Sequence, residues 1–339
     1  MKEDLTIEWV TAADDYKCKL SSETQKIAKD ELREDKNTRD QALQQMRDWI
    51  KMNPRIENSR LDAKWLLRFL RTKKFNVPMA QEAAERYLLL RQAYNPAFNN
   101  LDIGEPVMDE LLSLGYIFAV PGRDNKGRRV IVARPGVFDP YKYTNADMCK
   151  IHAITYEALM EDEENQIRGF VHFADGGGVS FPHLTLFTPR EAVRIVKNGE
   201  RTVPMRHKEV HAINVPSSLK FALDFGMSLI SEKIRKRIKI YTSLEDALNN
   251  KIDASMLPKE YGGTMPMKEM IELWRKELIE IRPTLILHDK MKVRTHLYSE
   301  KAREGAISAL KQGFGCQDVS STDSTLHGIT GSFRKLEVD

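Results

Sequence analysis

The sequence predicts an α/β protein in which an all-helical N-terminal domain precedes a domain built on a mostly parallel sheet. Two observations support this fold class. Up to about residue 100, apolar residues recur at helical spacing among many charged ones. From residue 106 onward, short apolar runs alternate with helical patterns, which is typical of strands connected by helices. Pro96 and the polar run after it place the domain boundary near residue 100.

The expected domains follow from these changes of pattern. A weakly patterned segment precedes the helical domain, and a helix and a tail rich in Ser, Thr and Gly follow the α/β domain. The expected divisions are 1–20 (N-terminal segment), 21–100 (helical domain), 101–265 (α/β domain) and 266–339 (C-terminal helix and tail).

The helical domain is expected to hold three charged helical stretches. They cover residues 21–53, 61–75 and 77–94. In the middle stretch, leucines occupy one face while Lys64, Arg68 and Arg71 lie along another. A charged helix face is usually solvated or paired with acidic neighbours. We therefore expect these basic residues to contact water or the acidic first helix, and we expect the acidic run 161–164 to be a solvated corner rather than a metal site.

Strands and helices alternate through the α/β domain. Strands are expected at 116–120, 128–134, 169–175, 209–215 and 238–243. Helices are expected at 107–115, 145–161, 188–197, 217–230, near Leu244 and at 267–282. Pro189 stands at the first position of the helix that begins at Thr188, where helices favour proline. Pro121-Gly122 and the run 125–127 are expected to form the turn between the first two strands.

The stretch 203–239 combines an apolar helix with two basic clusters. Phe221, Phe225 and Leu229 recur at i, i+4 and i+8, so they form one apolar stripe. Basic residues precede this helix at 206–208 and follow it from Lys233 onward. One interpretation is a lid that covers an apolar cavity and meets a charged surface. The other is an ordinary sheet-covering helix with a solvated end, and the stretch alone favours neither.

Composition excludes several classes of protein. The net charge is only +4, from 53 basic and 49 acidic residues, so the whole chain gives no case for nucleic-acid binding. Cys18, Cys149 and Cys316 are odd in number and far apart, which favours reduced thiols in the cytosol. The sequence starts without the apolar run of a signal peptide and has no apolar stretch of the ~20 residues that span a membrane. We expect a soluble protein whose membrane contact is peripheral.

The sequence offers little catalytic chemistry. The glycines at 176–178 lack the G-x-G-x-x-G spacing, and neither a P-loop nor a G-x-S-x-G elbow is present. His152 and Tyr156 lie one helical turn apart and are the best candidates for proton transfer, but no carboxylate with acid–base spacing stands beside them. The histidines show no metal-ligand spacing. We therefore expect no enzyme, no cofactor and no metal site.

Four motifs occur in a characteristic order. They are LLRFLRTKKF at 66–75, the strand ending in Asp175-x-x-Gly178, the NVP-to-helix join at 214–230, and LPKEYGG at 257–263. Together they resemble the CRAL-TRIO lipid-binding family, near its tocopherol-transfer, retinaldehyde-binding and clavesin branch. The resemblance covers about residues 25–275, and EDEENQIRGF and GSFRKLEVD resemble insect members. It implies a sheet that floors an apolar cavity, closed by a mobile lid helix at about 216–230.

The resemblance implies a mostly apolar ligand site. The residues at matching pocket positions are Cys149, His152, Tyr156, Phe170, Ala174, Phe187, Ile195, Val203, Met205, Val210, Phe221, Phe225 and Leu229. Each apolar member of this set is also consistent with ordinary core packing. Asp175 and Gly178 match a strand-end pattern that we expect to be structural.

Two departures from family patterns narrow the expected cargo. Phosphatidylinositol-transfer members carry a glutamate, within Y-P-E-R, where this chain has Met205. This difference argues against a phospholipid headgroup in the cavity. Retinaldehyde carriers place a glutamate where this chain has Ala174, which argues against retinal, although His152 stands where those carriers have a polar tyrosine.

The resemblance also implies a membrane site. Tocopherol-transfer proteins bind phosphatidylinositol bisphosphate through a basic patch, and this chain keeps a positive charge at each matching position. These positions are Lys73, Arg206, Lys208, Lys233 and Arg237. Lys233 and Arg237 are four residues apart, so we expect them to point the same way from one helix end. Lys73 comes from the helical domain, so the site is expected at the seam between the domains.

Three functional hypotheses follow. The first is a monomeric cytosolic carrier that binds one hydrophobic ligand (a tocopherol, retinoid, carotenoid or similar isoprenoid) and exchanges it at membranes containing phosphatidylinositol bisphosphate. The second is a phosphoinositide-binding trafficking adaptor of the clavesin type on endosomes. The third is an isomerase or oxidoreductase that acts on a bound isoprenoid through His152 and Tyr156. We expect transient contact with endosomal or plasma membranes and no nucleic-acid partner.

Overall fold

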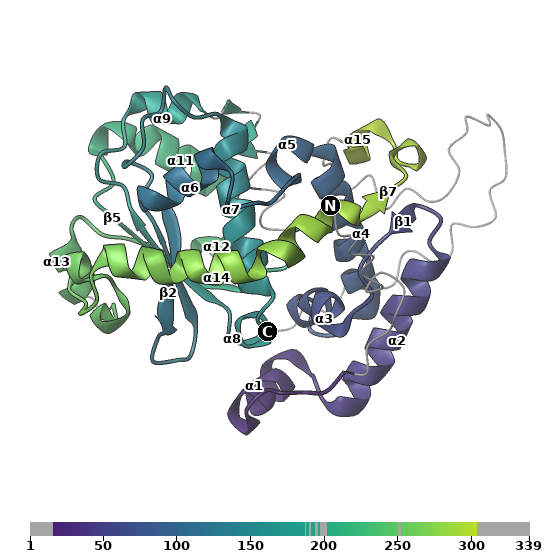
Figure 1. Cartoon of the computed structure of the whole chain (residues 1–339). Coiled ribbons are helices and arrows are strands. Elements are labelled where there is room, and N and C mark those ends of the chain that lie inside the picture. Colours follow the sequence, from purple (N-terminus) through teal and green to yellow (C-terminus); the bar gives the residue numbers. More distant parts are fainter. Residues whose placement is uncertain are drawn as a thin grey trace, which may run out of the picture.

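The computed structural model describes residues 16–186, 188, 189, 191–193, 196, 202–249 and 252–303 (Figure 1). Its N-terminal part is helical. The helices are α1 (Ser22–Leu32), α2 (Lys36–Met52), α3 (Ala63–Thr72), α4 (Val77–Ala93) and α5 (Asn95–Phe98). The first four each begin after a residue whose side chain accepts a hydrogen bond from a first-turn amide. These capping residues are Ser21, Asp35, Asp62 and Asn76.

Helix α3 is the centre of this helical part. Its Trp65 is 1% exposed, and the ring lies 5.5 Å from that of Phe69 and 5.7 Å from that of Tyr87 in α4. Leu66 and Leu70 are fully buried beside them. The leucines predicted to share one face of this helix therefore do form a core.

In the described part of the chain, one sheet holds five strands in the order β2-β3-β4-β5-β6. The strands are β2 (Ile117–Arg123), β3 (Arg129–Ala133), β4 (Phe170–Asp175), β5 (His207–Ile213) and β6 (Ile238–Ile240). β2 pairs with β3 in antiparallel fashion, whereas β3 to β6 are parallel. The predicted α/β class with a mostly parallel sheet is confirmed.

The turn between β2 and β3 contains the predicted run 125–127 but not Pro121 and Gly122. Pro121 and Gly122, expected in the turn, lie within β2, and the reversal is made by 124–128. The register of β2 against β3 shifts between Ala119 and Arg123. Proline and glycine are tolerated there because β2 is an edge strand and the irregular pairing removes the need for a regular donor.

Helices connect the strands, as Figure 1 shows. They are α6 (Pro106–Ser113), α7 (Asn145–Met160), α8 (Glu163–Arg168), α9 (Phe181–Thr185), α11 (Lys220–Leu229), α12 (Glu232–Arg235), α13 (Leu244–Asn249) and α14 (Met267–Leu287). The start of α7 is fixed by a capping box, in which Thr144 and Asp147 exchange hydrogen bonds with each other's backbone amides. The helix expected at 188–197 lies largely outside the described residues, and the helix expected at 217–230 is a 3-10 turn followed by α11.

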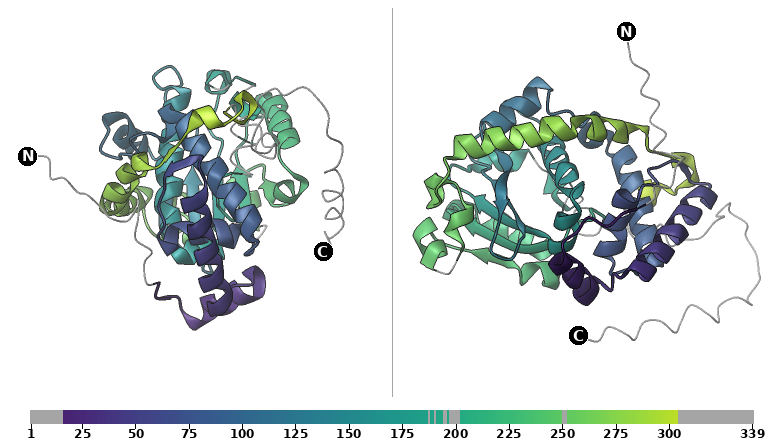
Figure 2. Two further views of the ribbon diagram at one scale, coloured as in Figure 1. Left: turned by 90° about the vertical axis from the view of Figure 1, so that its right-hand side faces the viewer. Right: turned by 60° about the horizontal axis from the view of Figure 1, so that its bottom comes forward.

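Helix α14 runs past its predicted end at 282, through Pro283, and carries the chain back to the helical part. It packs along β2 and α7, and Figure 2 shows it extending from the sheet to the N-terminal helices. Beyond it, β7 (Lys292–Val293) pairs antiparallel with β1 (Ile56–Asn58), and α15 (Glu300–Arg303) packs on α4. The side chains of Met291, Val293, Tyr298 and Ala302 complete the apolar core around α3.

Three of the motifs noted in the sequence meet at the end of β4. The Tyr261 hydroxyl of LPKEYGG donates to Asp175 Oδ2 over 2.6 Å, and the other carboxylate oxygen accepts from Asn214 and from the Gly177 amide. Asp175 thus joins three loops. None of the helices in the described ranges has both the length and the apolarity needed to cross a membrane.

Candidate functional site

One face of the sheet carries side chains too small to fill the space above it. Ala133, Ala174 and Ala212 stand side by side on β3, β4 and β5, and Ile240 of β6 completes the row. All four keep accessible surface, and Ile240 is 43% exposed. A well-packed α/β core buries such positions on both faces. The row therefore marks a place where the sheet is not covered by packed side chains of the described residues.

A line of polar side chains follows the same face. His152 of α7 bonds through Nε2 to the Tyr116 hydroxyl (3.0 Å) and through Nδ1 to the Tyr156 hydroxyl (3.1 Å). The Tyr156 ring lies edge-on to His172 of β4, with the centroids 6.2 Å apart. His172 Nε2 lies 2.8 Å from Nδ1 of His207, the first residue of β5. The line thus runs from the start of β2, across α7, to the sheet.

The pKa shifts of the side chains in this line keep them neutral. Burial lowers the pKa of His152 to about 4 and raises that of Tyr156 to about 12. Burial, then the neighbouring His207 and His152, lowers the pKa of His172 well below its ordinary value. His152, Tyr156 and His172 nevertheless keep part of their surface accessible, as side chains beside unfilled space do. They can exchange hydrogen bonds with a neutral polar group but offer no charge to a ligand.

The other predicted ligand residues fall into four groups. Cys149, Val203 and Val210 are partly exposed, whereas Phe170 and Met205 are 1% and 6% exposed and belong to the core cluster. Phe221, Phe225 and Leu229 all lie on α11. Phe187 and Ile195 lie outside the described residues.

Helix α11 is apolar and yet unburied. None of its ten residues is buried, and Phe221 and Phe225 are 58% and 42% exposed. These two side chains are one turn apart, so they share a face. Exposed aromatic side chains grouped on one helix mark a surface that binds something apolar.

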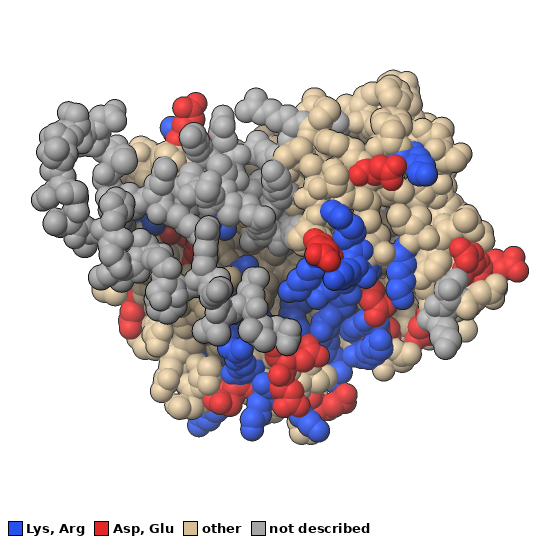
Figure 3. Space-filling view, turned by 180° about the vertical axis from the view of Figure 1, so that it is seen from behind, with Lys and Arg blue, Asp and Glu red and all other residues tan. Residues whose placement is uncertain are grey.

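The five predicted membrane-binding cations fall into two sets whose members influence one another, Lys73 with Lys233 and Arg206 with Lys208 and Arg237. Burial, then Arg86 and Lys233, lowers the pKa of Lys73. Burial also lowers the pKa of Arg206 and of Lys208, with Arg237 adding to both effects. The five cations come from the end of α3, from β5 and the residue before it, and from α12 and the residues after it. Figure 3 shows Lys and Arg side chains gathered on the face opposite to that of Figure 1.

Two of these cations are fixed by the backbone. Arg206 donates from Nη1 to the Ile167 carbonyl, and Arg237 donates from Nη1 to the His207 carbonyl. Arg206 and Lys208 also meet a carboxylate, Glu31 of α1, at 2.6 and 2.8 Å. Nothing in the local sequence indicates this acidic partner, because it lies about 175 residues away.

The predicted solvation of the basic face of α3 is wrong for Arg68 and Arg71, which are fully buried. Arg68 donates to Glu157 over 2.8 Å and to Glu161 over 2.7 Å, and Arg60 also pairs with Glu161. Glu161 is 6% exposed, so the expectation that the run 161–164 is solvated is wrong for this residue, whereas the other three keep accessible surface.

Arg71 pairs with Glu34, just after α1, and with Glu163 of α8. For Arg71 the predicted pairing with the acidic first helical stretch is therefore confirmed. Together the two arginines of α3 form a buried ionic seam between the helical part and the helices α7 and α8.

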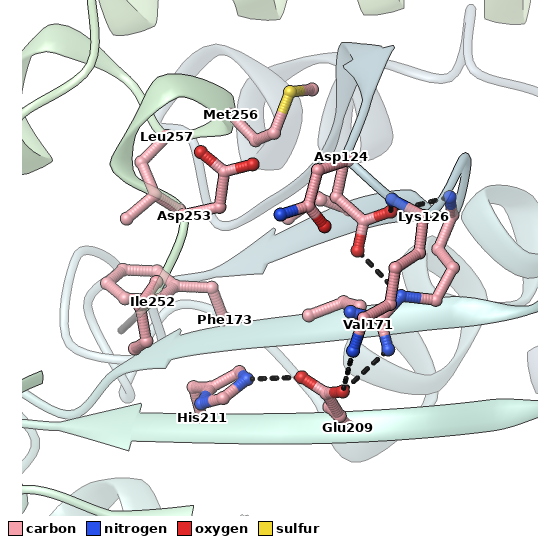
Figure 4. A pocket seen from close by; sticks show the side chains of 13 residues that line it. Asp124, Lys126, Val171, Phe173, Glu209, His211, Ile252, Asp253, Met256 and Leu257 are labelled. Atoms are coloured by element: carbon pink, nitrogen blue, oxygen red, sulfur yellow. Dashed lines mark hydrogen bonds and ion pairs between the residues drawn. The ribbon is translucent and has the colours of Figure 1, made fainter. Parts of the chain in front are cut away.

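A second hollow of about 120 Å³ lies on the opposite face of the sheet (Figure 4). Val171 and Phe173 form its floor, and its polar residues satisfy one another. Arg128 bonds Asp124 and Glu209, while His211 lies between Glu209 and the Tyr241 hydroxyl. Asp124, Arg128 and Glu209 are thus bound to one another within this hollow. Among the described residues, no group of three His, Cys, Asp or Glu side chains is placed to hold a metal.

A family model and several known proteins match this chain. Residues 114–263 match the family model described as CRAL/TRIO domain. "Alpha-tocopherol transfer protein-like" of Homo sapiens is 32% identical over 250 residues, which are 74% of this chain and 72% of that protein. "Clavesin-1" of Xenopus laevis is 30% identical over 260 residues, 77% and 78% of the two chains. Among solved structures, "Crystal structure of Sfh5" is 15% identical with a TM-score of 0.47, covering 73% of this chain and 99% of that one.

Proposed function

Because the chain belongs to the CRAL/TRIO domain family of lipid-binding proteins, we propose that it is a cytosolic carrier for one hydrophobic ligand. The proposed cargo is a tocopherol, retinoid, carotenoid or similar isoprenoid, which enters and leaves at membranes containing phosphatidylinositol bisphosphate. The names of the relatives support transfer of such a lipid, since one of them is tocopherol-transfer-like. No catalytic step is proposed.

The observation that carries the proposal is the open row of alanines on β3, β4 and β5. A lipid of this kind gains ~25 cal/mol for each Å² of apolar surface removed from water. The row supplies an apolar floor, and α11 supplies an apolar helix that lacks buried residues. In this proposal, α11 covers the bound lipid in solution and turns its Phe221–Phe225 face to the bilayer during exchange.

Mass spectrometry of organic extracts from the purified protein tests the proposal. A carrier is expected to yield one isoprenoid-like lipid in stoichiometric amount. Protein stripped of lipid should take up a tocopherol or retinol probe one to one. Extracts that contain only a mixture of phospholipids, together with no uptake of either probe, would exclude the carrier function.

The polar line on α7 predicts a preference for ligands with a hydroxyl or carbonyl group. Tyr156→Phe removes the partner of His152 Nδ1 and leaves a polar atom facing the ligand unpaired, which costs about 1–3 kcal/mol. A fluorescence titration measures the difference in binding free energy between a hydroxylated ligand and its deoxy analogue. We expect this difference to be smaller in the variant by that amount. Tyr241→Phe is the matched control, because this tyrosine pairs with His211 on the opposite face of the sheet. Equal discrimination by wild type and Tyr156→Phe would remove this line from the ligand site.

Membrane exchange is proposed to depend on the cluster of Lys73, Arg206, Lys208, Lys233 and Arg237. Each basic residue near an anionic membrane contributes about 1 kcal/mol within a Debye length, so five give firm but reversible docking. α12, which carries Lys233, follows α11 with only two residues between them. Capture of a headgroup at α12 would therefore bring α11 to the bilayer surface.

Replacing two of these cations should separate docking from cargo binding. Lys233→Ala/Arg237→Ala is expected to lower affinity for phosphoinositide vesicles by about 2 kcal/mol, roughly thirtyfold, while ligand affinity in solution stays unchanged. Vesicle flotation and a ligand-transfer assay measure the two properties. Arg235→Ala/Lys236→Ala is the matched control at the end of α12, where Lys236 pairs with Glu232. If the first variant floats as wild type does, the membrane site lies elsewhere.

A second candidate function is a phosphoinositide-binding adaptor on endosomes, favoured by the similarity to clavesins, which nearly equals that to the tocopherol-transfer-like proteins. In this case membrane binding would be the primary activity and the pocket lipid secondary. Tight phosphoinositide binding by protein whose extracts contain no stoichiometric lipid would favour the adaptor. Both proposals place a monomer at endosomal or plasma membrane surfaces.

A further inference from the structure

The carboxylate of Glu31 in α1 bonds two of the cations proposed to bind a headgroup phosphate. Its Oε2 accepts from Arg206 Nη2 over 2.6 Å and from Lys208 Nζ over 2.8 Å, so one oxygen bridges two cations. Partial burial alone would raise the pKa of this carboxyl group, but the hydrogen bonds from Lys208 and Arg206 hold its pKa below the usual value. The carboxylate therefore stays charged and bound to both cations at neutral pH.

The position of Glu31 is not needed to hold α1 in place. α1 is fixed on α8 by Ala28 and Leu32, which pack with Ile167, and by Thr24, which bonds Glu164 and Arg168. Glu31 itself is more than a third exposed and lies in the last turn of α1. Negative charge is unfavourable at a helix C-terminus, so this carboxylate is placed against the local helix dipole.

We propose that Glu31 is an internal competitor for the membrane headgroup, which sets how much negative charge a membrane must carry before the protein docks. The inference rests on the proposed function of the basic cluster. A headgroup phosphate can bond Arg206 and Lys208 only after the Glu31 carboxylate has swung away. The apparent affinity is then the intrinsic affinity reduced by the fraction of molecules in which the two cations are free.

Competition with Glu31 favours lipids whose headgroup carries more negative charge. A phosphomonoester carries about −1.5 to −2 charges at neutral pH and can displace a carboxylate that carries one. A singly charged phosphodiester lipid binds too weakly to do so at ordinary membrane concentrations. Because α1 stays on α8 throughout, only the Glu31 side chain has to move.

The test compares vesicle binding by wild type and Glu31→Gln. Glu31→Gln is expected to bind phosphatidylcholine vesicles doped with phosphatidylinositol bisphosphate about fivefold more tightly, and to begin binding vesicles doped with phosphatidylserine. Glu23→Gln is the control: it removes one charge from the same helix, where Glu23 pairs with Arg168. The control should change binding by less than about twofold.

A double-mutant cycle links the gain to the site. In a Lys208→Ala background the added effect of Glu31→Gln should be largely lost. Equal gains from Glu31→Gln and Glu23→Gln would show a general charge effect and overturn the inference. Suppose that wild type binds phosphoinositide vesicles and that Lys233→Ala/Arg237→Ala does not. If Glu31→Gln then binds as wild type does, the docking function stands and only the inference about Glu31 is wrong. If neither wild type nor Glu31→Gln binds phosphoinositide vesicles, the docking function fails and the inference fails with it.

Discussion

Replacing Arg68 by methionine is expected to lower the free energy of unfolding by about 3–5 kcal/mol. Arg68 is fully buried, and its guanidinium bonds Glu157 and Glu161 while lying 4.3 Å from the Trp65 ring centroid. Methionine keeps much of the volume but leaves Glu157 with Arg91 alone, whose Nη1 lies 3.9 Å from the carboxylate. Uncompensated buried charge is among the few causes of losses this large.

Urea denaturation of Arg68→Met and Arg282→Met measures this effect against a matched control. Arg282 pairs with Asp102 on the surface, where its side chain is 45% exposed, so its loss should cost only about 0–1 kcal/mol. Burial keeps the pKa of Glu157 raised in the wild type, and without Arg68 this pKa rises further. The deficit of the variant should thus shrink as pH falls and the carboxyl becomes neutral. A deficit below about 1 kcal/mol at neutral pH would mean that the seam is not buried as described.

Filling the alanine row should abolish cargo binding without unfolding the protein. A tryptophan buries at least about 150 Å². At ~25 cal/mol per Å², Ala174→Trp should weaken ligand binding by roughly 4 kcal/mol, or about 700-fold. Because Ala174 faces unfilled space, the free energy of unfolding should stay within about 1 kcal/mol of wild type.

Ala119→Trp is the comparison for Ala174→Trp. Ala119 stands on β2 opposite Ile131 and is fully buried, so an indole there should overpack the core and cost about 1–3 kcal/mol of stability. Fluorescence titration with a tocopherol or retinol probe and thermal unfolding give the two readouts. Undiminished uptake of the probe by Ala174→Trp would place the cavity away from this row.

Local patterns were sufficient to predict most of the fold. The helical spacing of apolar residues before residue 100 and the alternation of strands and helices after residue 106 act over a few residues, so the element order and the α/β class could be predicted. The prediction was wrong for Pro121 and Gly122 because residues typical of turns are also tolerated in an irregular edge strand. Only the pairing with β3 shows that they lie in such a strand.

The site was harder to predict because it depends on how neighbouring strands are aligned and on ion pairs between residues far apart in the sequence. Ala133 and Ala212 carry no signal in the sequence and become informative only when β3, β4 and β5 align them with Ala174. Arg68 resembles any solvated helix arginine until Glu157, 89 residues away, is placed beside it. The assignments of ligand and headgroup residues remain predictions, and the experiments above test them.

The pairing of β1 with β7 has a consequence for synthesis on the ribosome. The core around α3 needs Val293 and Tyr298, whose hydroxyl donates to Glu85 of α4, and Asn58 lies opposite Lys292 in the small sheet. A nascent chain that has emerged only as far as α5 lacks all of these partners. The helices translated first are therefore the last to complete their packing. A growing chain exposes their apolar faces until nearly the whole described sequence has been made.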